Sequence, residues 1–160
     1  MGDSRELFDN VDLNLVLANI ESDFELTLRE KSGRIVCQKL PVLYALPIQI
    51  QQLFSNLISN SLKFSEANPI VEIVYEGPVP GKPDCRRISV LDNGIGINPD
   101  FADKAFNMFS RMDRNLPGTG IGLALCKKIV ETHEGELTVR ARQGGGSRFD
   151  IDLPAKLIVG

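Results

Sequence analysis

Two alternating segments in the last third of the chain place the tightest limit on its fold. Residues 136–142 (ELTVRAR) and 147–153 (SRFDIDL) both alternate apolar and polar side chains, and QGGG lies between them. Alternation with a period of two gives a strand one apolar and one polar face, and a short glycine-rich connection lets two such strands pair as a hairpin. The chain therefore predicts antiparallel strands that bury one face.

Three segments carry helical signals. Residues 13–30 place apolar side chains close to helical spacing, residues 47–64 predict a long helix that begins at a proline, and residues 120–133 predict a helix closed by Gly135. A short helix is also expected over residues 98–105. Residues 107–118 lack periodicity and contain Pro117 and Gly118, so we expect a mobile loop there.

Further strands are predicted between the helices. They are RIVCQKL (34–40), IVEIVY (70–75) and RRISVLDN (86–93), and the turn-rich loop EGPVPGKPD (76–84) joins the last two. Helices interspersed with strands in this order predict an α/β (α+β) two-layer sandwich. We expect a mixed, largely antiparallel sheet of about five strands, covered on one face by about three helices.

The composition excludes several classes of protein. A chain of 160 residues is most consistent with one domain, and its net charge of −3 predicts neither a nucleic-acid surface nor direct membrane contact. The cysteines form no Cys-x-x-Cys pair, which favours a reducing compartment over a disulfide framework or a zinc site. The longest apolar stretch, LPVLYALPI, is too short to span a membrane. These features predict a cytoplasmic location and leave open a membrane-anchored parent protein.

The segment VLDNGIGI (90–97) is an apolar strand that ends in an Asp-Asn pair and two glycines. Asn-Gly is frequent in hairpin turns, so one interpretation is a turn. The other is a strand end, marked by the Asp92 carboxylate, against which a flat ligand lies. The segment alone leaves both interpretations open.

A polar edge marks the helix predicted over residues 47–64. Asn56, Asn60 and Lys63 fall within an arc of roughly 60° on a helical projection. Asparagine is a mediocre helix former, so two on one edge lower the helix propensity without an obvious structural return. An amide oxygen suits Mg²⁺ and an ammonium group suits phosphate, so this edge is a candidate metal and phosphate site. A solvated polar edge is the alternative.

Three alternating glycines open the helix predicted over residues 120–133, in GTGIGLALCKKIV (118–130). Free N–H groups at such a helix start can bind an anion. The spacing Gly-x-Gly-x-Gly differs from the dinucleotide fingerprint, and the segment contains no Gly-Lys-Ser/Thr. Taken alone, it does not identify a nucleotide site.

Four segments together identify a family. NLISNSLKF, VLDNGIGI, AFNMFSRM and GTGIGLALCKKIV occur in this order, and they resemble the N, G1, F and G2 boxes of the histidine-kinase ATP-binding domain. That domain belongs to a superfamily with the gyrase and heat-shock-chaperone ATPases. The resemblance covers residues 11–154 and implies a Bergerat-type α/β sandwich with an ATP lid, in which ATP and Mg²⁺ bind between helices and sheet. Residues 1–10 are then an expression remnant or a linker from the dimerisation helices, and residues 155–160 a C-terminal tail.

The resemblance also implies roles for individual residues. Asp92 resembles the carboxylate that accepts a hydrogen bond from the adenine amine, and Asn60 resembles the Mg²⁺ ligand. Asn56 and Arg111 match catalytic positions, Arg111 near the γ-phosphate, although a solvated loop arginine is the alternative for Arg111. The positions that match nucleotide-binding ones are Asn60, Lys63, Phe64, Asp92, Gly94, Ile95, Gly96, Gly118, Thr119, Gly120, Gly122 and Leu123.

The chain departs from the family pattern at three places. Ser61 replaces the usual alanine, Glu134 stands where a glycine is common, and LYALPIQ lacks the acidic residue that often precedes the N-box helix. None of these positions touches the expected ligand, so the departures leave the expectation of nucleotide binding unchanged.

The only histidine of the chain, His133, lies at the predicted end of a helix. It lacks the helical context of a phosphate acceptor, so we expect a surface or capping residue. The chain therefore resembles the catalytic half of a histidine kinase alone. The resemblance implies two partners: the dimerisation/histidine phosphotransfer domain of the same parent protein, and the receiver domain of a response regulator.

Two other functions stay open. An ATP hydrolase of this fold places Glu where this chain has Asn56, because a carboxylate can act as a base toward water. The anti-sigma-factor serine kinases share that Glu, so Asn56 favours a histidine kinase. A non-catalytic module that binds nucleotide is the other possibility, and the intact Asp92, Asn60, Lys63 and glycine segments argue against it.

Overall fold

A five-stranded mixed sheet forms one layer of the molecule. The computed structural model describes residues 6–63, 65, 67–96 and 120–159. The strands are β2 (Arg34–Cys37), β4 (Ile70–Val79), β5 (Lys82–Asp92), β6 (Glu136–Ala141) and β7 (Ser147–Pro154), in the order β2-β4-β5-β7-β6. Only β2 and β4 pair in parallel, and the other neighbours in this sheet are antiparallel. The predicted fold class is confirmed.

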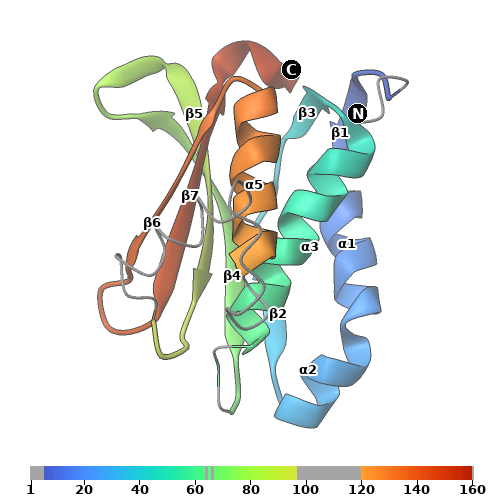
Figure 1. Cartoon of the computed structure of the whole chain (residues 1–160), viewed down its shortest axis with the longest axis vertical. Coiled ribbons are helices and arrows are strands. Elements are labelled where there is room, and N and C mark those ends of the chain that lie inside the picture. Colours follow the sequence, from blue (N-terminus) through green and yellow to red (C-terminus); the bar gives the residue numbers. More distant parts are fainter. Residues whose placement is uncertain (1–5, 64, 66, 97–119, 160) are drawn as a thin grey trace.

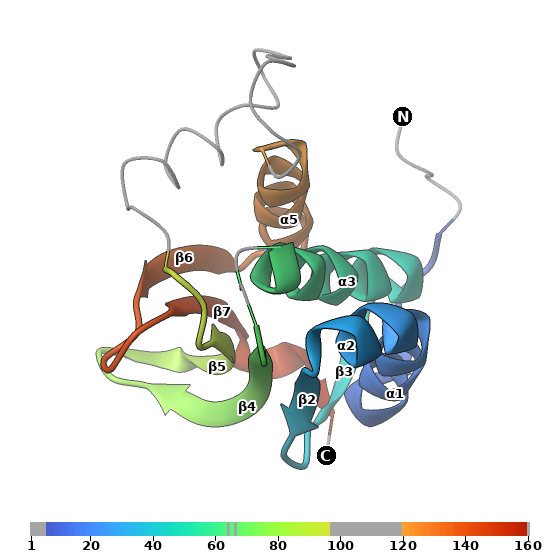
Figure 2. The ribbon, with the colours of Figure 1, turned by 90° about the horizontal axis from the view of Figure 1, so that it is seen from below.

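Helices in the described part of the chain form the second layer. They are α1 (Leu13–Asp23), α2 (Glu25–Lys31), α3 (Pro47–Lys63) and α5 (Gly120–Thr132), and they lie on one side of the sheet (Figures 1 and 2). Between the layers, Leu57 and Ile58 of α3 pack with Ile73, Val90 and Phe149 of the sheet, and all five are fully buried. None of these helices combines the length and the apolar character that a membrane span requires.

The segment predicted as one helix over residues 13–30 is two helices. The break is at Phe24, which has φ −98° and ψ 12° and is the C-cap of α1 and the N-cap of α2. Ile20 before the break and Leu28 after it are both buried in the same core. The apolar spacing therefore continues across the break, which is why the sequence did not reveal it.

A second, three-stranded sheet was not predicted. It consists of β1 (Asp9–Asp12), β3 (Val42–Ala45) and β8 (Ile158–Val159), with β3 in the middle and antiparallel to both neighbours. Strands of two to four residues are too short to show a period of two. The predicted domain limits at residues 11 and 154 both fall short of this sheet's ends, because β1 begins at Asp9 and β8 ends at Val159.

The loop predicted over residues 76–84 is mostly strand. β4 continues to Val79 and β5 begins at Lys82, with a register shift between Tyr75 and Gly77. The prolines in this segment had suggested a loop, but β2 pairs with β4 only as far as Ile73. Beyond that point β4 is an edge strand, where proline is tolerated.

Ion pairs cover the face of the sheet that lies opposite the helices. Asp150 and Asp152 of β7 are almost fully buried there, between the inward-facing apolar residues of the same strand. Arg87 donates to Asp152 at 2.8 Å, and Arg140 lies 3.0 Å from Asp150. The alternation predicted for SRFDIDL is thus confirmed, with the aspartates on one face and Phe149 on the other.

Candidate functional site

Helix α3 carries an amide that is buried without a partner. Asn60 is only 4% exposed, and no described group lies within hydrogen-bonding distance of its Oδ1 or its Nδ2. The Oγ of the neighbouring Ser61 is in the same state. Leaving such a group unsatisfied destabilises a fold by about 1–3 kcal/mol, so native proteins rarely do it without a reason. A ligand that binds Asn60 would remove that penalty.

The other polar residues of the predicted edge are more accessible. Asn56 is half-buried, and Lys63 is exposed as the last residue of α3. The neighbouring thiol of Cys126 on α5 donates to the carbonyl of Leu53 on α3 at 3.7 Å. Burial raises the pKa of Cys126 to about 12, against which the nearby Asn56 amide acts, so the thiol stays protonated. Cys126 therefore links α5 to α3 beside Asn56.

Charged side chains from the N-terminal part of the chain hold both ends of α3. The carboxylate of Glu6 accepts a hydrogen bond of 2.5 Å from the N–H of Ile48, in the first turn. At the other end, the ammonium of Lys31 donates to the carbonyls of Leu62 at 2.6 Å and Ser65 at 3.1 Å. Each charge complements the helix dipole at its end. Glu6 thus supplies from a distance the acidic group that LYALPIQ lacks.

Asp92 ends β5, and donors from the described residues reach only one of its carboxylate oxygens. It is 4% exposed, and its Oδ1 accepts from the backbone N–H of Gly94 at 2.9 Å and of Ser147 at 3.2 Å. Among the residues that the structure describes, no donor reaches Oδ2. The carboxylate is therefore fixed by one oxygen and retains the other as an acceptor.

Asn93 faces away from this carboxylate and has a structural role. Its Oδ1 accepts from the N–H of Ile70 at 2.8 Å, and its Nδ2 donates to the carbonyl of Asn68 at 3.3 Å. The strand β5 that precedes it already pairs with β4 on one side and β7 on the other. A strand that followed Asn93-Gly94 in a hairpin would find no free edge of β5, so the interpretation of VLDNGIGI as a hairpin turn is wrong.

The glycine turn between β6 and β7 packs directly against the backbone of Asp92. A Cβ on Gly146, which has φ +99°, would lie 1.9 Å from the carbonyl oxygen of Asp92. The carbonyl of Gly146 in turn lies 3.4 Å from the position of a Cβ on Gly96, where φ is +89°. The sequence predicted only a turn at QGGG, and this contact was not predicted. Three consecutive glycines, more than a tight hairpin needs, were the available signal.

The remaining predicted residues lie in several environments. Ile95 is 69% exposed, whereas Leu123 of α5 is packed in the hydrophobic core. A Cβ on Gly122 would meet open space, and Gly120 begins α5. Outside the described residues lie Phe64, Arg111, Gly118 and Thr119, together with the predicted helix over 98–105 and the predicted loop over 107–118.

The C-terminal half of α3, the end of β5 and the start of α5 lie at the same end of the molecule (Figure 1). The structure thus brings Asn60, Asp92 and the helix that follows the glycine segment to one end. This arrangement offers a buried amide, a carboxylate acceptor and a helix N-terminus, a combination suited to a ligand with both a base and phosphates.

His133 is buried, so a surface position is wrong, but it does cap α5, because its ring meets a carbonyl of the last turn of that helix. It is 2% exposed, its Nε2 accepts from the N–H of Leu46 at 3.1 Å, and its Nδ1 lies 2.8 Å from the carbonyl of Ile129. Because Leu46 donates to Nε2, the proton must be on Nδ1, which donates to Ile129. The ring of Phe8 lies 5.6 Å away. Long-range packing that the sequence does not display makes this histidine a core residue.

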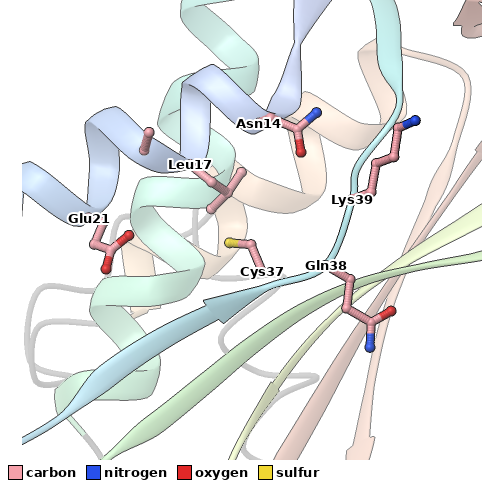
Figure 3. A pocket seen from close by; sticks show the side chains of 7 residues that line it. Asn14, Leu17, Glu21, Cys37, Gln38 and Lys39 are labelled. Carbon is pink, nitrogen blue, oxygen red and sulfur yellow. The ribbon is translucent and has the colours of Figure 1, made fainter.

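A hollow of about 350 Å³ lies elsewhere, between α1 and the segment after β2 (Figure 3). Asn14 lines it, but both of its amide atoms already bond to the backbone of Leu40. Partial burial and the Glu21 carboxylate raise the pKa of Cys37 to about 11, so its thiol is a poor nucleophile. Neither Asn14 nor Cys37 therefore makes this hollow a candidate reactive site.

The chain is similar to known proteins in both family and sequence. A family model described as histidine kinase-, DNA gyrase B-, and HSP90-like ATPase matches residues 45–157. The chain is 41% identical over 130 residues to cyanobacterial phytochrome A of Nostoc sp. (strain PCC 7120), covering 79% of this chain and 16% of that protein. It is 32% identical over 154 residues to the sensor protein kinase WalK of Staphylococcus aureus, covering 92% of this chain and 36% of that protein. The chain thus spans a minor part of these relatives.

Solved structures share the fold. The catalytic domain of the histidine kinase ThkA superimposes with a TM-score of 0.75 at 23% identity, over 92% of this chain and 97% of that chain. Full-length ShkA in complex with AMPPNP gives a TM-score of 0.73 at 25% identity, over 97% of this chain and 32% of that chain.

Proposed function

The chain belongs to the family of histidine kinase-, DNA gyrase B-, and HSP90-like ATPases, and on that premise we propose that it is the ATP-binding catalytic domain of a two-component sensor histidine kinase. It binds Mg-ATP and donates the γ-phosphate to a histidine on a separate dimerisation domain, from which the phosphate passes to a response-regulator aspartate. The similarity to WalK and to the complex of ShkA with AMPPNP supports this proposal.

The single observation that carries the proposal is the unpartnered amide of Asn60. Its buried Oδ1 has no partner in the described ranges, and an amide oxygen is a suitable ligand for Mg²⁺. We expect Asn60 to hold the ion and Lys63 to meet the phosphates. A Mg²⁺ ion bound there would neutralise phosphate charge, which is the chief requirement of phosphoryl transfer.

The base of the nucleotide is assigned to Asp92. Its Oδ2 is left to accept a hydrogen bond from the exocyclic amine of adenine, while Oδ1 is held by two backbone donors. Phe64, Gly94, Ile95 and Gly96 are the remaining proposed contacts around the base. For the triphosphate we propose Gly118, Thr119, Gly120, Gly122 and Leu123.

The transfer step needs an acceptor from another domain. Both ring nitrogens of His133 are engaged in hydrogen bonds and the side chain is buried, so it is a poor acceptor of phosphate. The amide of Asn56 cannot take a proton from water near neutral pH, which disfavours hydrolysis. Arg111 is proposed to stabilise charge on the γ-phosphate. The proposed partners are the dimerisation/histidine phosphotransfer domain and the response-regulator receiver domain, in the cytoplasm.

The proposal is tested by titrating Mg-ATP into the chain and then adding a histidine-bearing dimerisation domain with ATP labelled at the γ-phosphate. We expect binding, no labelling of the chain alone, and labelling of the added domain. Release of inorganic phosphate without any labelling would favour an ATP hydrolase. Binding without either reaction would favour a non-catalytic module, and acid-labile label on His133 would contradict its structural role.

A further inference from the structure

We propose that Arg142 is a positioning residue for Asp92, and that through it the turn between β6 and β7 sets the preference for adenine over guanine. The inference rests on the proposed function, since it concerns the same nucleotide site. It assigns a role to a residue outside the four segments that resemble the N, G1, F and G2 boxes.

Arg142 ties three strands together at the end of the sheet where Asp92 lies. It directly follows β6, and its Nη1 donates to the carbonyl of Asp92 at 3.2 Å while its Nη2 donates to Oε1 of Glu72 at 2.6 Å. Glu72 belongs to β4, in register with Leu91 of β5. Since β7 lies between β6 and β5, the guanidinium reaches past one strand to connect the ends of two others.

The same turn also holds the side chain of Asp92. The N–H of Ser147 donates to its Oδ1, and Gly146 packs so closely on its carbonyl that no side chain fits. The turn is itself closed by the N–H of Arg142, which donates to the carbonyl of Gly146 at 3.0 Å. One short segment therefore fixes both the backbone and the carboxylate of Asp92.

Rejection of guanine depends on how firmly the carboxylate is held. Guanine presents a carbonyl where adenine presents an amine, so an acceptor held rigidly in place would face another acceptor. Sites built around a buried polar group discriminate strongly because the wrong partner leaves that group unpaired. A carboxylate that could shift, or admit a water molecule, would tolerate guanine. Loss of Arg142 should therefore affect selectivity more than it affects affinity for ATP.

The test is calorimetric titration of Mg-ATP and of Mg-GTP into the 160-residue chain and two variants, Arg142→Met and Glu72→Gln. We expect Arg142→Met to lower the ratio of ATP to GTP affinity by about threefold or more, or ~0.7 kcal/mol. Glu72→Gln should lower it less, because the neutral amide oxygen can still accept from Arg142. Arg140→Met is the matched control, since Arg140 is 57% exposed and pairs with Asp150 on the outer face of the sheet.

Thermal unfolding of the same variants separates positioning from a general loss of structure. A lower ratio in Arg142→Met, with the ratio unchanged in Arg140→Met and similar melting temperatures in both, supports the proposal. An unchanged ratio in Arg142→Met overturns it, as does an equal loss of both affinities that follows a loss of stability. If Arg142→Met does not fold, an unchanged ratio in Glu72→Gln overturns it. Failure of the unmodified chain to bind either nucleotide would instead refute the proposed function.

Discussion

The two ends of α3 treat buried polar groups in opposite ways. At its N-terminal end, the buried His133 is hydrogen-bonded through both ring nitrogens, one of which accepts from the N–H of Leu46. At its C-terminal end, Asn60 and Ser61 are as deeply buried, yet their side-chain polar atoms have no partner in the part of the chain that the structure describes.

This difference separates structural from functional polar residues. A buried group that the protein itself satisfies stabilises the fold and needs nothing further. A buried group that the protein leaves open destabilises the fold until a ligand meets it. Composition alone would have drawn attention to the single histidine, but hydrogen bonding makes His133 part of the scaffold, and the open amide supports the proposal that Asn60 binds the ligand.

The largest expected effect on nucleotide binding is at the C-terminal end of α3, where Asn60 has no partner among the described residues. Asn60→Ala should weaken Mg-ATP binding by about 100-fold or more and abolish transfer, because the proposed metal ligand is lost. The free energy of unfolding should stay the same or rise, since an unsatisfied buried amide is removed. Calorimetry and chemical denaturation measure the two quantities, with Asn19→Ala on the exposed face of α1 as control. Transfer at the unmodified rate would show that Asn60 is not the ligand.

At the N-terminal end of α3 we expect the opposite: a substitution should lower stability and leave nucleotide affinity unchanged. His133→Ala should lower the free energy of unfolding by about 2–4 kcal/mol, because it leaves a cavity and removes the partner of the Leu46 N–H. Nucleotide affinity should be unchanged while the protein is folded. Urea denaturation with the exposed neighbour variant Glu131→Ala as control tests this. A large loss of ATP affinity in folded His133→Ala would contradict the purely structural role of His133.

A smaller effect is expected on the ratio of ATP affinity to GTP affinity, which we attribute to Asp92. We expect ATP to bind at least about tenfold more tightly than GTP, or ~1.4 kcal/mol, because Asp92 presents an acceptor to the base. Asp92→Asn should erase most of this preference, since an amide can present either a donor or an acceptor. Titration of both nucleotides into both proteins measures it. Equal affinities in the unmodified chain would remove Asp92 from the base site.

The smallest effect is expected from the helix cap. Glu6→Gln should lower the free energy of unfolding by about 0.3–1 kcal/mol, and less at high salt, because it removes a charge that complements the helix dipole. Glu136→Gln, which removes one partner of an exposed pair with Lys82 on a strand, is the control and should not show the effect of a helix dipole. Denaturation curves at low and high salt that coincide for Glu6→Gln and the unmodified chain would contradict an electrostatic cap.

The sequence predicted those features whose pattern lies within one short segment, and it did not predict contacts between residues far apart in the chain. The α3 segment and the β6–β7 hairpin were predicted because a helical or alternating period is visible within each of them. The Glu6 cap joins residues 42 positions apart, and the bond from Leu46 to His133 joins residues 87 apart. No local pattern marks such contacts. For the same reason Asn60 could be named from its helix edge, whereas the role of Arg142 became visible only when the sheet brought it to Asp92.

The position of Glu6 gives α3 a mechanical character. With 17 residues, the helix is a rod about 25 Å long. One end of this rod is hydrogen-bonded to Glu6, just before β1, and the other end carries the amide proposed to hold the metal. Packing along its whole length makes α3 far stiffer than any loop. A force applied at Glu6 would therefore act on the helix as a whole, including the turn that carries Asn60, rather than on its first turn alone.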